Sequence, residues 1–278
     1  MRKWLRRLFA TMAIVAIAFV AIVWIGSERV LRRSYVDVAV AAPTLVGSAE
    51  SGKHWAAILG CTDCHDATLH GNVIDDESFL LGTLVAPNLT VKRKGYTDAG
   101  LARMIRFGIR SDGTGVQLMP SSAFYHVDDQ TIADIIAFVR SAPDAERTLP
   151  LATNGPLTRW NLLTGEWKLA PDAIDRKAAR LGDAPHTDAL DRGHYLATVA
   201  CGECHGLEQK GDPAGGVPNL AVAKVYTAEE FTNLMRTGNA KGGRQISQMM
   251  SSVAKRRFAA FTDDEITSLK NYLDSRAP

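Results

Sequence analysis

The residues that could do chemistry stand in two copies of one pattern, in which two cysteines are followed directly by a histidine. The copies are Cys61-Thr62-Asp63-Cys64-His65 and Cys201-Gly202-Glu203-Cys204-His205. In a C-x-x-C-H pattern the two thiols can add to the vinyl groups of a haem, and the histidine then binds the iron. The chain has 4 cysteines, all within the two copies, so no thiol remains for a disulfide or a separate nucleophile.

A redox dithiol or a zinc site is the competing interpretation of these cysteines. A redox dithiol does not require the histidine that follows the second cysteine of both copies. A zinc site would have to join cysteine pairs from opposite halves of the chain, whereas zinc-ribbon pairs are usually about 15–20 residues apart. The pattern therefore predicts two covalent haem c groups, attached at Cys61, Cys64, Cys201 and Cys204, with iron ligands His65 and His205.

The similarity between the two halves extends well beyond the cysteines, so the chain is an internal repeat. Downstream of the cysteines, each half has a Pro-Asn-Leu segment, which contains Pro87 in the first half and Pro218 in the second. A helix then follows in each half and is expected to end at Gly108 or Gly238, because glycine favours the left-handed conformation at a helix C-terminus. Each half closes with an amphipathic helix, predicted over residues 129–141 and 263–275 from apolar residues at helical spacing.

The capping pattern of the second half supports these helices. Thr227 with Glu230 and Thr262 with Glu265 fit the capping box, in which each side chain satisfies a free backbone amide of the first turn. No convincing run of alternating apolar residues indicates a strand. The sequence therefore predicts an all-α fold with one domain over residues 48–142, another over 188–278, and a linker over 143–187.

Each half resembles a class I cytochrome c domain, in which an N-terminal helix leads into C-x-x-C-H and a C-terminal helix crosses the first. The whole chain resembles membrane-anchored, two-haem c-type cytochromes of bacteria, including cytochrome partners or subunits of periplasmic dehydrogenases. The resemblance implies that the carbonyl oxygens of Pro87 and Pro218 accept the outer N–H of His65 and His205. An ordinary turn at each Pro-Asn pair would use the same prolines.

A methionine is expected as the sixth iron ligand in each half, because Met/His ligation is typical of electron-carrying cytochromes c. Met119 precedes a proline between two predicted helices, in the place where the family carries this ligand. The second half offers two neighbours, of which Met250 is favoured and Met249 is the alternative. Four other histidines compete for the position but are each expected to pack or to lie at the surface: His54, His70, His126 and His194.

An apolar stretch without a charge runs from Leu8 to Gly26. At 1.5 Å per residue it is about 28 Å long, which is enough to cross a hydrocarbon core of about 30 Å. Basic residues flank it on both sides and orient it only weakly. Because C-x-x-C-H haems are attached in the periplasm of such bacteria, residues 1–34 are expected to anchor periplasmic domains in the inner membrane. A cleaved signal peptide is the alternative, with Ala39-Val40-Ala41 as its candidate cleavage site.

The remaining sequence features concern the surface and the linker. A net charge of +2 does not favour nucleic acid as a partner. The short basic runs Lys92-Arg93-Lys94 and Lys255-Arg256-Arg257 are expected to be solvated faces. The linker is too long for a simple loop in a compact domain, so it is expected to wrap across the domains, with Trp160 and Trp167 as packing anchors.

Together these features predict an electron carrier and not an enzyme. The expected partners are redox proteins: a dehydrogenase or quinol-oxidising complex as the donor, and an oxidase or reductase as the acceptor. Neither a nucleophile–base set nor a pair of catalytic carboxylates stands out in the sequence. A two-haem peroxidase, which needs an open iron, and a haem subunit of a dehydrogenase complex are the alternatives.

Overall fold

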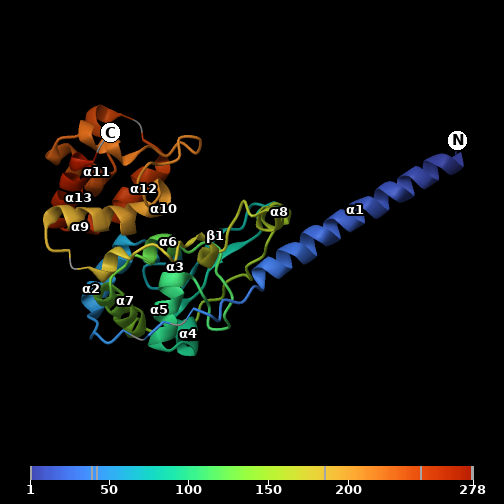
Figure 1. Cartoon of the computed structure of the whole chain (residues 1–278), viewed down its shortest axis with the longest axis horizontal. Coiled ribbons are helices and arrows are strands. Elements are labelled where there is room, and N and C mark those ends of the chain that lie inside the picture. Colours follow the sequence, from blue (N-terminus) through green and yellow to red (C-terminus); the bar gives the residue numbers. More distant parts are fainter. Residues whose placement is uncertain (1, 39, 42, 185, 245, 277–278) are drawn as a thin grey trace.

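The chain is described by a computed structural model over residues 2–38, 40–41, 43–184, 186–244 and 246–276. A long N-terminal helix, α1 (Arg2–Leu31), projects from a mostly helical body built of two halves (Figure 1). Ala39 of the candidate cleavage site and residues 277–278 of the predicted second domain lie outside the described residues.

The first half combines helices with one small sheet. Its elements are α2 (Ala49–Ile58), α3 (Cys61–His65), β1 (Asn72–Asp75), β2 (Leu84–Ala86), α4 (Leu89–Lys92), the 3-10 turn η1 (Arg93–Gly95), α5 (Asp98–Phe107), α6 (Ser121–Phe124) and α7 (Asp129–Ser141). Strands β1 and β2 pair antiparallel, with Val73 opposite Val85. This short hairpin is the one departure from the predicted all-α architecture, and its strands are too short to show an alternating pattern.

Among the described residues, the segment between the halves and the second half contain helices and loops but no β-strand. The elements are α8 (Pro156–Thr164), η2 (Ala170–Ala173), η3 (Leu181–Asp183), α9 (Ala189–Leu196), the π-turn η4 (Ala197–Cys201), α10 (Gly202–His205), η5 (Leu220–Val225), α11 (Ala228–Thr237), η6 (Lys241–Gly243), α12 (Gln248–Arg256), η7 (Phe258–Ala260) and α13 (Asp263–Ser275).

The predicted helix ends are confirmed. Helices α7 and α13 have the bounds expected from their apolar spacing. Both capping boxes of the second half are formed, at the starts of α11 and α13. Gly108 and Gly238 close α5 and α11 in the left-handed conformation, with φ of 64° and 70°.

In each half the first and last helices pack together through a glycine. A β-carbon on Gly52 of α2 would lie 1.9 Å from the carbonyl oxygen of Asp134 in α7. A β-carbon on Gly193 of α9 would lie 2.1 Å from the carbonyl oxygen of Ser268 in α13. The backbones therefore approach more closely than any other residue type would allow. This helix pair carries the segment that enters each C-x-x-C-H motif.

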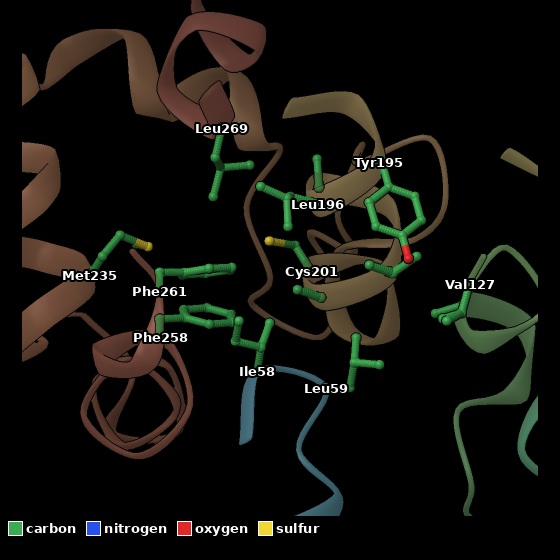
Figure 2. Close-up of a cluster of buried hydrophobic side chains, with 14 of the residues drawn as sticks. Ile58, Leu59, Val127, Tyr195, Leu196, Cys201, Met235, Phe258, Phe261 and Leu269 are labelled. Carbon is green, nitrogen blue, oxygen red and sulfur yellow. The ribbon is translucent and has the colours of Figure 1, made fainter. Parts of the chain in front are cut away.

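The two halves share one hydrophobic core. Ile58 and Leu59, at the end of α2, project toward Cys201, Phe258 and Phe261 of the second half (Figure 2). These five side chains are at most 8% exposed. The halves are therefore packed against each other through a common buried interface.

Polar contacts reinforce the same junction. The Tyr195 hydroxyl of α9 donates to Asp128, the N-cap residue of α7, at 2.7 Å. His54 of α2 pairs with Glu265 of α13 at 3.0 Å. Each contact joins one half to a helix start in the other, which fixes the direction in which the halves face.

The linker wraps over the first half and the base of α1. Trp167 packs against a second core cluster whose buried members include Leu162 and Leu169. Further along, Arg180 donates to the carbonyl oxygen of Tyr125 at 3.1 Å. Trp160 also packs, with its ring 5.6 Å from that of Phe19 in α1. The expectation of a packing anchor is confirmed for Trp167, whereas Trp160 packs on α1 and stays 41% exposed.

The glycine contact between α9 and α13 yields a stability prediction. Gly193→Ala is expected to lower the free energy of unfolding by about 1–3 kcal/mol, because the added methyl group must push α13 away. Gly95→Ala is the matched control, since a β-carbon there meets nothing within 4 Å. Guanidinium unfolding of the holoprotein in detergent, followed by circular dichroism, measures the difference. Equal stability of the two variants would contradict the close approach.

Candidate functional site

The two C-x-x-C-H motifs end in the same local structure, although the first is entered through left-handed Gly60 and the second through the π-turn η4. Helices α3 and α10 carry their histidines, and each helix is followed by a residue with positive φ: Asp66 at 70° and Gly206 at 74°. Three residues later the backbone again takes positive φ, at Leu69 (63°) and Gln209 (53°). Positive φ is uncommon in residues other than glycine, and here it recurs four positions after each motif histidine, at Leu69 and Gln209. The repeat therefore includes the conformation of the loop after each histidine.

Backbone hydrogen bonds hold each of these loops closed. The amide of Gly71 donates to the carbonyl oxygen of His65 at 2.9 Å, and Gly211 donates to that of His205 at 2.8 Å. The loop is thereby folded back under the histidine in both halves. Sequence reasoning missed this conformation, since Leu69 and Gln209 share no residue type that signals positive φ.

Each motif histidine is oriented by a proline carbonyl. Nδ1 of His65 lies 2.9 Å from the carbonyl oxygen of Pro87, and Nδ1 of His205 lies 2.9 Å from that of Pro218. A carbonyl can only accept, so Nδ1 carries the proton. The nitrogen left for an iron is therefore Nε2 in both halves. The contacts match the geometry implied by the resemblance, and their role toward an iron stays a prediction.

Burial sets the protonation of the motif side chains. It lowers the pKa of His65 and of His205, against the opposing effect of the proline carbonyls, and so favours the neutral imidazole that binds metals. Burial also raises the pKa of the Cys61 and Cys201 thiols to about 12. Thiolates are the reactive form of cysteine, so burial disfavours redox chemistry of these two thiols.

The described residues suit haem and do not suit zinc. Among them, no group of three or more His, Cys, Asp or Glu side chains is placed to hold a metal ion. The four cysteines are free thiols, two in each motif, each pair followed by a histidine with an oriented ring. The donor set therefore fits one thioether-linked, histidine-ligated haem in each motif.

The candidate methionine ligands differ in exposure. Met119 and Met250 are partly buried and pack against the shared core, whereas Met249 is 71% exposed. A ligand inside a haem crevice is shielded from water. The burial of the side chains therefore favours Met250 over Met249 in the second half, and it is compatible with Met119 in the first. The assignment of each methionine to an iron stays a prediction.

The competing histidines are occupied by protein partners. The partners are Glu265 for His54, the carbonyl oxygen of Pro143 for His70, the amide of Leu181 for His126 and the ring of Tyr272 for His194. Each of these side chains therefore has a packing or hydrogen-bonding role in the fold, as expected from the sequence.

One arginine of the second half bridges the two motifs. Arg257 donates from Nε to Asp63 of the first motif and from an Nη to Glu203 of the second, each at 2.6 Å. Its side chain is 11% exposed. The two acidic residues are the variable positions inside C-x-x-C-H, so the bridge holds the motifs themselves together. The carboxylates of Glu203 and Asp63 outweigh the opposing effect of burial and raise the pKa of Arg257, which keeps it charged.

The expectation that Lys255-Arg256-Arg257 forms a solvated face is therefore wrong for its last residue. It is also wrong for Arg93, whose side chain is 11% exposed and donates to backbone carbonyls of α7. Both arginines lie beside exposed basic neighbours in the sequence, and only a partner distant in sequence draws each one inward. Composition alone carries no signal of that partner.

The shape of the first motif is adapted to this bridge. Gly60 precedes Cys61 with φ of 76°, and a β-carbon there would lie 2.2 Å from Cζ of Arg257. The guanidinium group thus rests directly on the backbone that enters the motif. A side chain at position 60 would displace it.

Comparison with known proteins identifies part of the chain. A cytochrome c family model matches residues 190–277, which run from the first turn of α9 past the end of α13. The chain carries a cytochrome c domain. The match spans the second C-x-x-C-H motif, Pro218 and both candidate methionines, so a covalent haem c is the cofactor that this domain type carries.

Relatives extend the similarity over most or nearly all of the chain. A diheme cytochrome c-type protein of Cereibacter sphaeroides is 26% identical, over 96% of the chain and 97% of its own length. The cytochrome c subunits of quinone alcohol dehydrogenases from Gluconacetobacter polyoxogenes and Komagataeibacter europaeus are each 24% identical over 82% of the chain. The chain covers 56% of the length of these two subunits. The chain is thus similar to electron-transfer cytochromes, including subunits of a dehydrogenase complex.

The exposure of the methionines leads to a prediction about potentials. Met250→Ala is expected to lower the reduction potential of the second haem, because thioether ligation favours the ferrous state. Met249→Ala is the matched control and should leave that potential unchanged, whereas Met119→Ala should lower the potential of the first haem. Potentiometric titration followed by visible absorbance measures all three. A shift with Met249→Ala alone would reverse the assignment.

The Arg257 bridge leads to a second prediction about potentials. Arg257→Met should lower the potentials of both haems by tens of millivolts, because two carboxylates lose their counter-charge and stabilise the ferric state. Charges about 10 Å apart interact by ~1–2 kcal/mol at an effective dielectric constant of about 20. Arg256→Met is the control, since that side chain also contacts Asp63 but is 60% exposed. Equal shifts in the two variants would show that the bridge has no special role.

Proposed function

We propose that this chain is a two-haem c-type cytochrome that carries electrons from a respiratory donor to an acceptor at the periplasmic face of the membrane. The haem irons would supply the one-electron chemistry by alternating between the ferric and ferrous states. The haem ligands would be His65 with Met119 and His205 with Met250. The chain is thus proposed to be a carrier and not an enzyme.

The observation that carries the proposal is the equivalence of the two motifs. Both histidines bind a proline carbonyl at 2.9 Å through Nδ1, and both are followed by a loop with the same pattern of positive φ. The family model matches the second motif alone. The matching geometry of the first motif supports a second haem at Cys61 and Cys64.

The junction between the halves supports a relay. Arg257 holds the acidic residues of both motifs, and Ile58 packs beside Cys201 and Phe261 in the shared core. The two motifs are thereby kept in one fixed relation. Transfer between them would need no docking of mobile domains, so the steps left to diffusion are the encounters with the donor and the acceptor.

The relatives support a dehydrogenase as the partner. Two of them are named as cytochrome c subunits of a quinone alcohol dehydrogenase. A role as the haem subunit of such a complex is therefore the second candidate, and it differs from the first only in whether the chain stays bound to its donor. Isolation in mild detergent with mass spectrometry of co-purified chains separates the two.

The N-terminal helix supports attachment to a membrane. An 18-residue window of α1 has a mean hydropathy of 2.7, and 6% of that window is buried in the protein. We propose that α1 crosses the bacterial inner membrane once, with the haem domains on the periplasmic side. The contact of α1 with α8 also favours an uncleaved segment over a signal peptide, because cleavage after residue 41 would remove the packing partner of α8.

The haem content and ligation test the proposal. The purified chain should contain two haems by pyridine haemochrome assay, and the Cys201→Ala/Cys204→Ala variant should contain one. Near-infrared magnetic circular dichroism of the ferric protein should show methionine-to-iron bands from both haems. One haem in the unaltered chain would refute the tandem arrangement. A high-spin haem with an open position would favour the peroxidase alternative.

A further inference from the structure

Helix α8 lies against the apolar part of α1 and reaches its polar C-terminal end. The ring of Trp160 is 5.6 Å from the ring of Phe19. A β-carbon on Gly26 would lie 2.5 Å from Cδ1 of Leu163. The contact between the helices therefore follows α1 from Phe19 to Gly26, inside the apolar stretch of residues 8–26.

The position of this contact places α8 at membrane depth. Phe19 lies seven residues before Gly26, and a helix rises about 1.5 Å per residue, so Phe19 is about 10 Å inside the end of the apolar stretch. If α1 crosses the bilayer over residues 8–26, Trp160 beside Phe19 lies within the outer part of the acyl-chain region.

Large apolar side chains around α8 are exposed, as a contact with acyl chains requires. Leu157 and Trp160 are each about 40% exposed and line the cavity between α8 and α1. Phe79 and Leu80 adjoin them, because the amide of Leu157 donates to the carbonyl oxygen of Leu80 at 3.0 Å. Phe79 is 82% exposed, which is unusual for a side chain of its size in contact with water.

The only charged side chain of α8, that of Arg159, is bound by the polar end of α1. Arg159 lies over the ring of Trp24, 3.6 Å from its centroid, and donates to Ser27 at 3.0 Å and to Glu28 at 3.3 Å. Its guanidinium group thus reaches toward the polar end of α1, as arginines do at a membrane surface. The charge does not oppose insertion of the apolar face.

A cavity of about 510 Å³ lies between α1 and α8, beside their contact. Its walls include Val20 and Val23 of α1, with Leu80 and Pro156 on the opposite side. Asn154 and Arg159 are its only polar lining residues among those described. An apolar cavity of this size next to a membrane-spanning helix can accommodate an acyl chain.

We propose that α8 and the Phe79-Leu80 turn form a second membrane contact, which inserts into the outer part of the bilayer and binds phospholipid acyl chains. The proposal rests on α1 being a membrane anchor. Because Trp167 and Leu162 tie this segment to the first half, the contact would hold that half in a fixed orientation over the membrane. The haem motifs would then face a membrane partner from a constant direction.

Photocrosslinking of the full chain in bacterial membranes tests the contact. The photoreactive residue p-benzoylphenylalanine replaces Phe79 in one variant and Leu157 in another, and variants with normal haem absorbance are irradiated. Ile14 within the apolar stretch is the positive control, and the half-exposed Val225 of the second half is the negative control. Mass spectrometry of the purified chain then identifies phospholipid adducts.

Lipid adducts at positions 14, 79 and 157, but not at 225, are the expected result. Adducts at position 14 with none at 79 or 157 would overturn the second contact and leave the anchor intact. Adducts of positions 79 and 157 with another protein would overturn it as well, because the face would then be a subunit interface. Failure of position 14 to react with lipid would refute the anchor and the contact together.

Discussion

The ion-paired bridge from Arg257 to Asp63 and Glu203 is the interaction on which the arrangement of the two motifs depends. A guanidinium group is suited to this role, because its rigid fork can donate to two carboxylates at once. The bridge is largely withdrawn from water, so its charges cost desolvation energy that their mutual attraction has to offset. Such a contact adds little net stability but is specific, since any other relation of the halves would leave buried charges unpaired.

The hydrophobic junction complements this bridge. Ile58 and Phe261 are almost completely buried between the halves, and they supply the non-directional part of the association. The polar contacts then select one orientation: Tyr195 with Asp128 on one side, and His54 with Glu265 on the other. The fixed orientation matters for the proposed electron transfer between two haems, because the rate of that transfer depends on the distance between them.

Helix α1 is joined to the body, like the two halves to each other, by apolar packing together with polar contacts. Apolar packing of Trp160 on Phe19 is accompanied by polar contacts of Arg159 with the residues that end the apolar stretch of α1. The linker between the halves thus contacts the N-terminal helix as well as the first half. Its length, which would be excessive for a connection alone, is explained by these contacts.

The local features of this protein follow from sequence because they depend on neighbouring residues. The C-x-x-C-H motifs, the capping boxes at Thr227 and Thr262 and the glycine ends of α5 and α11 each involve residues within a few positions of one another. Tertiary structure decided three other features. The strands β1 and β2 are too short to give a periodic signal. Arg257 turns inward and α8 packs on α1 because of partners that lie far away in the chain. Residue type and spacing therefore determined which chemistry the chain can carry, whereas long-range packing determined how its two motifs face each other and how α1 joins the body.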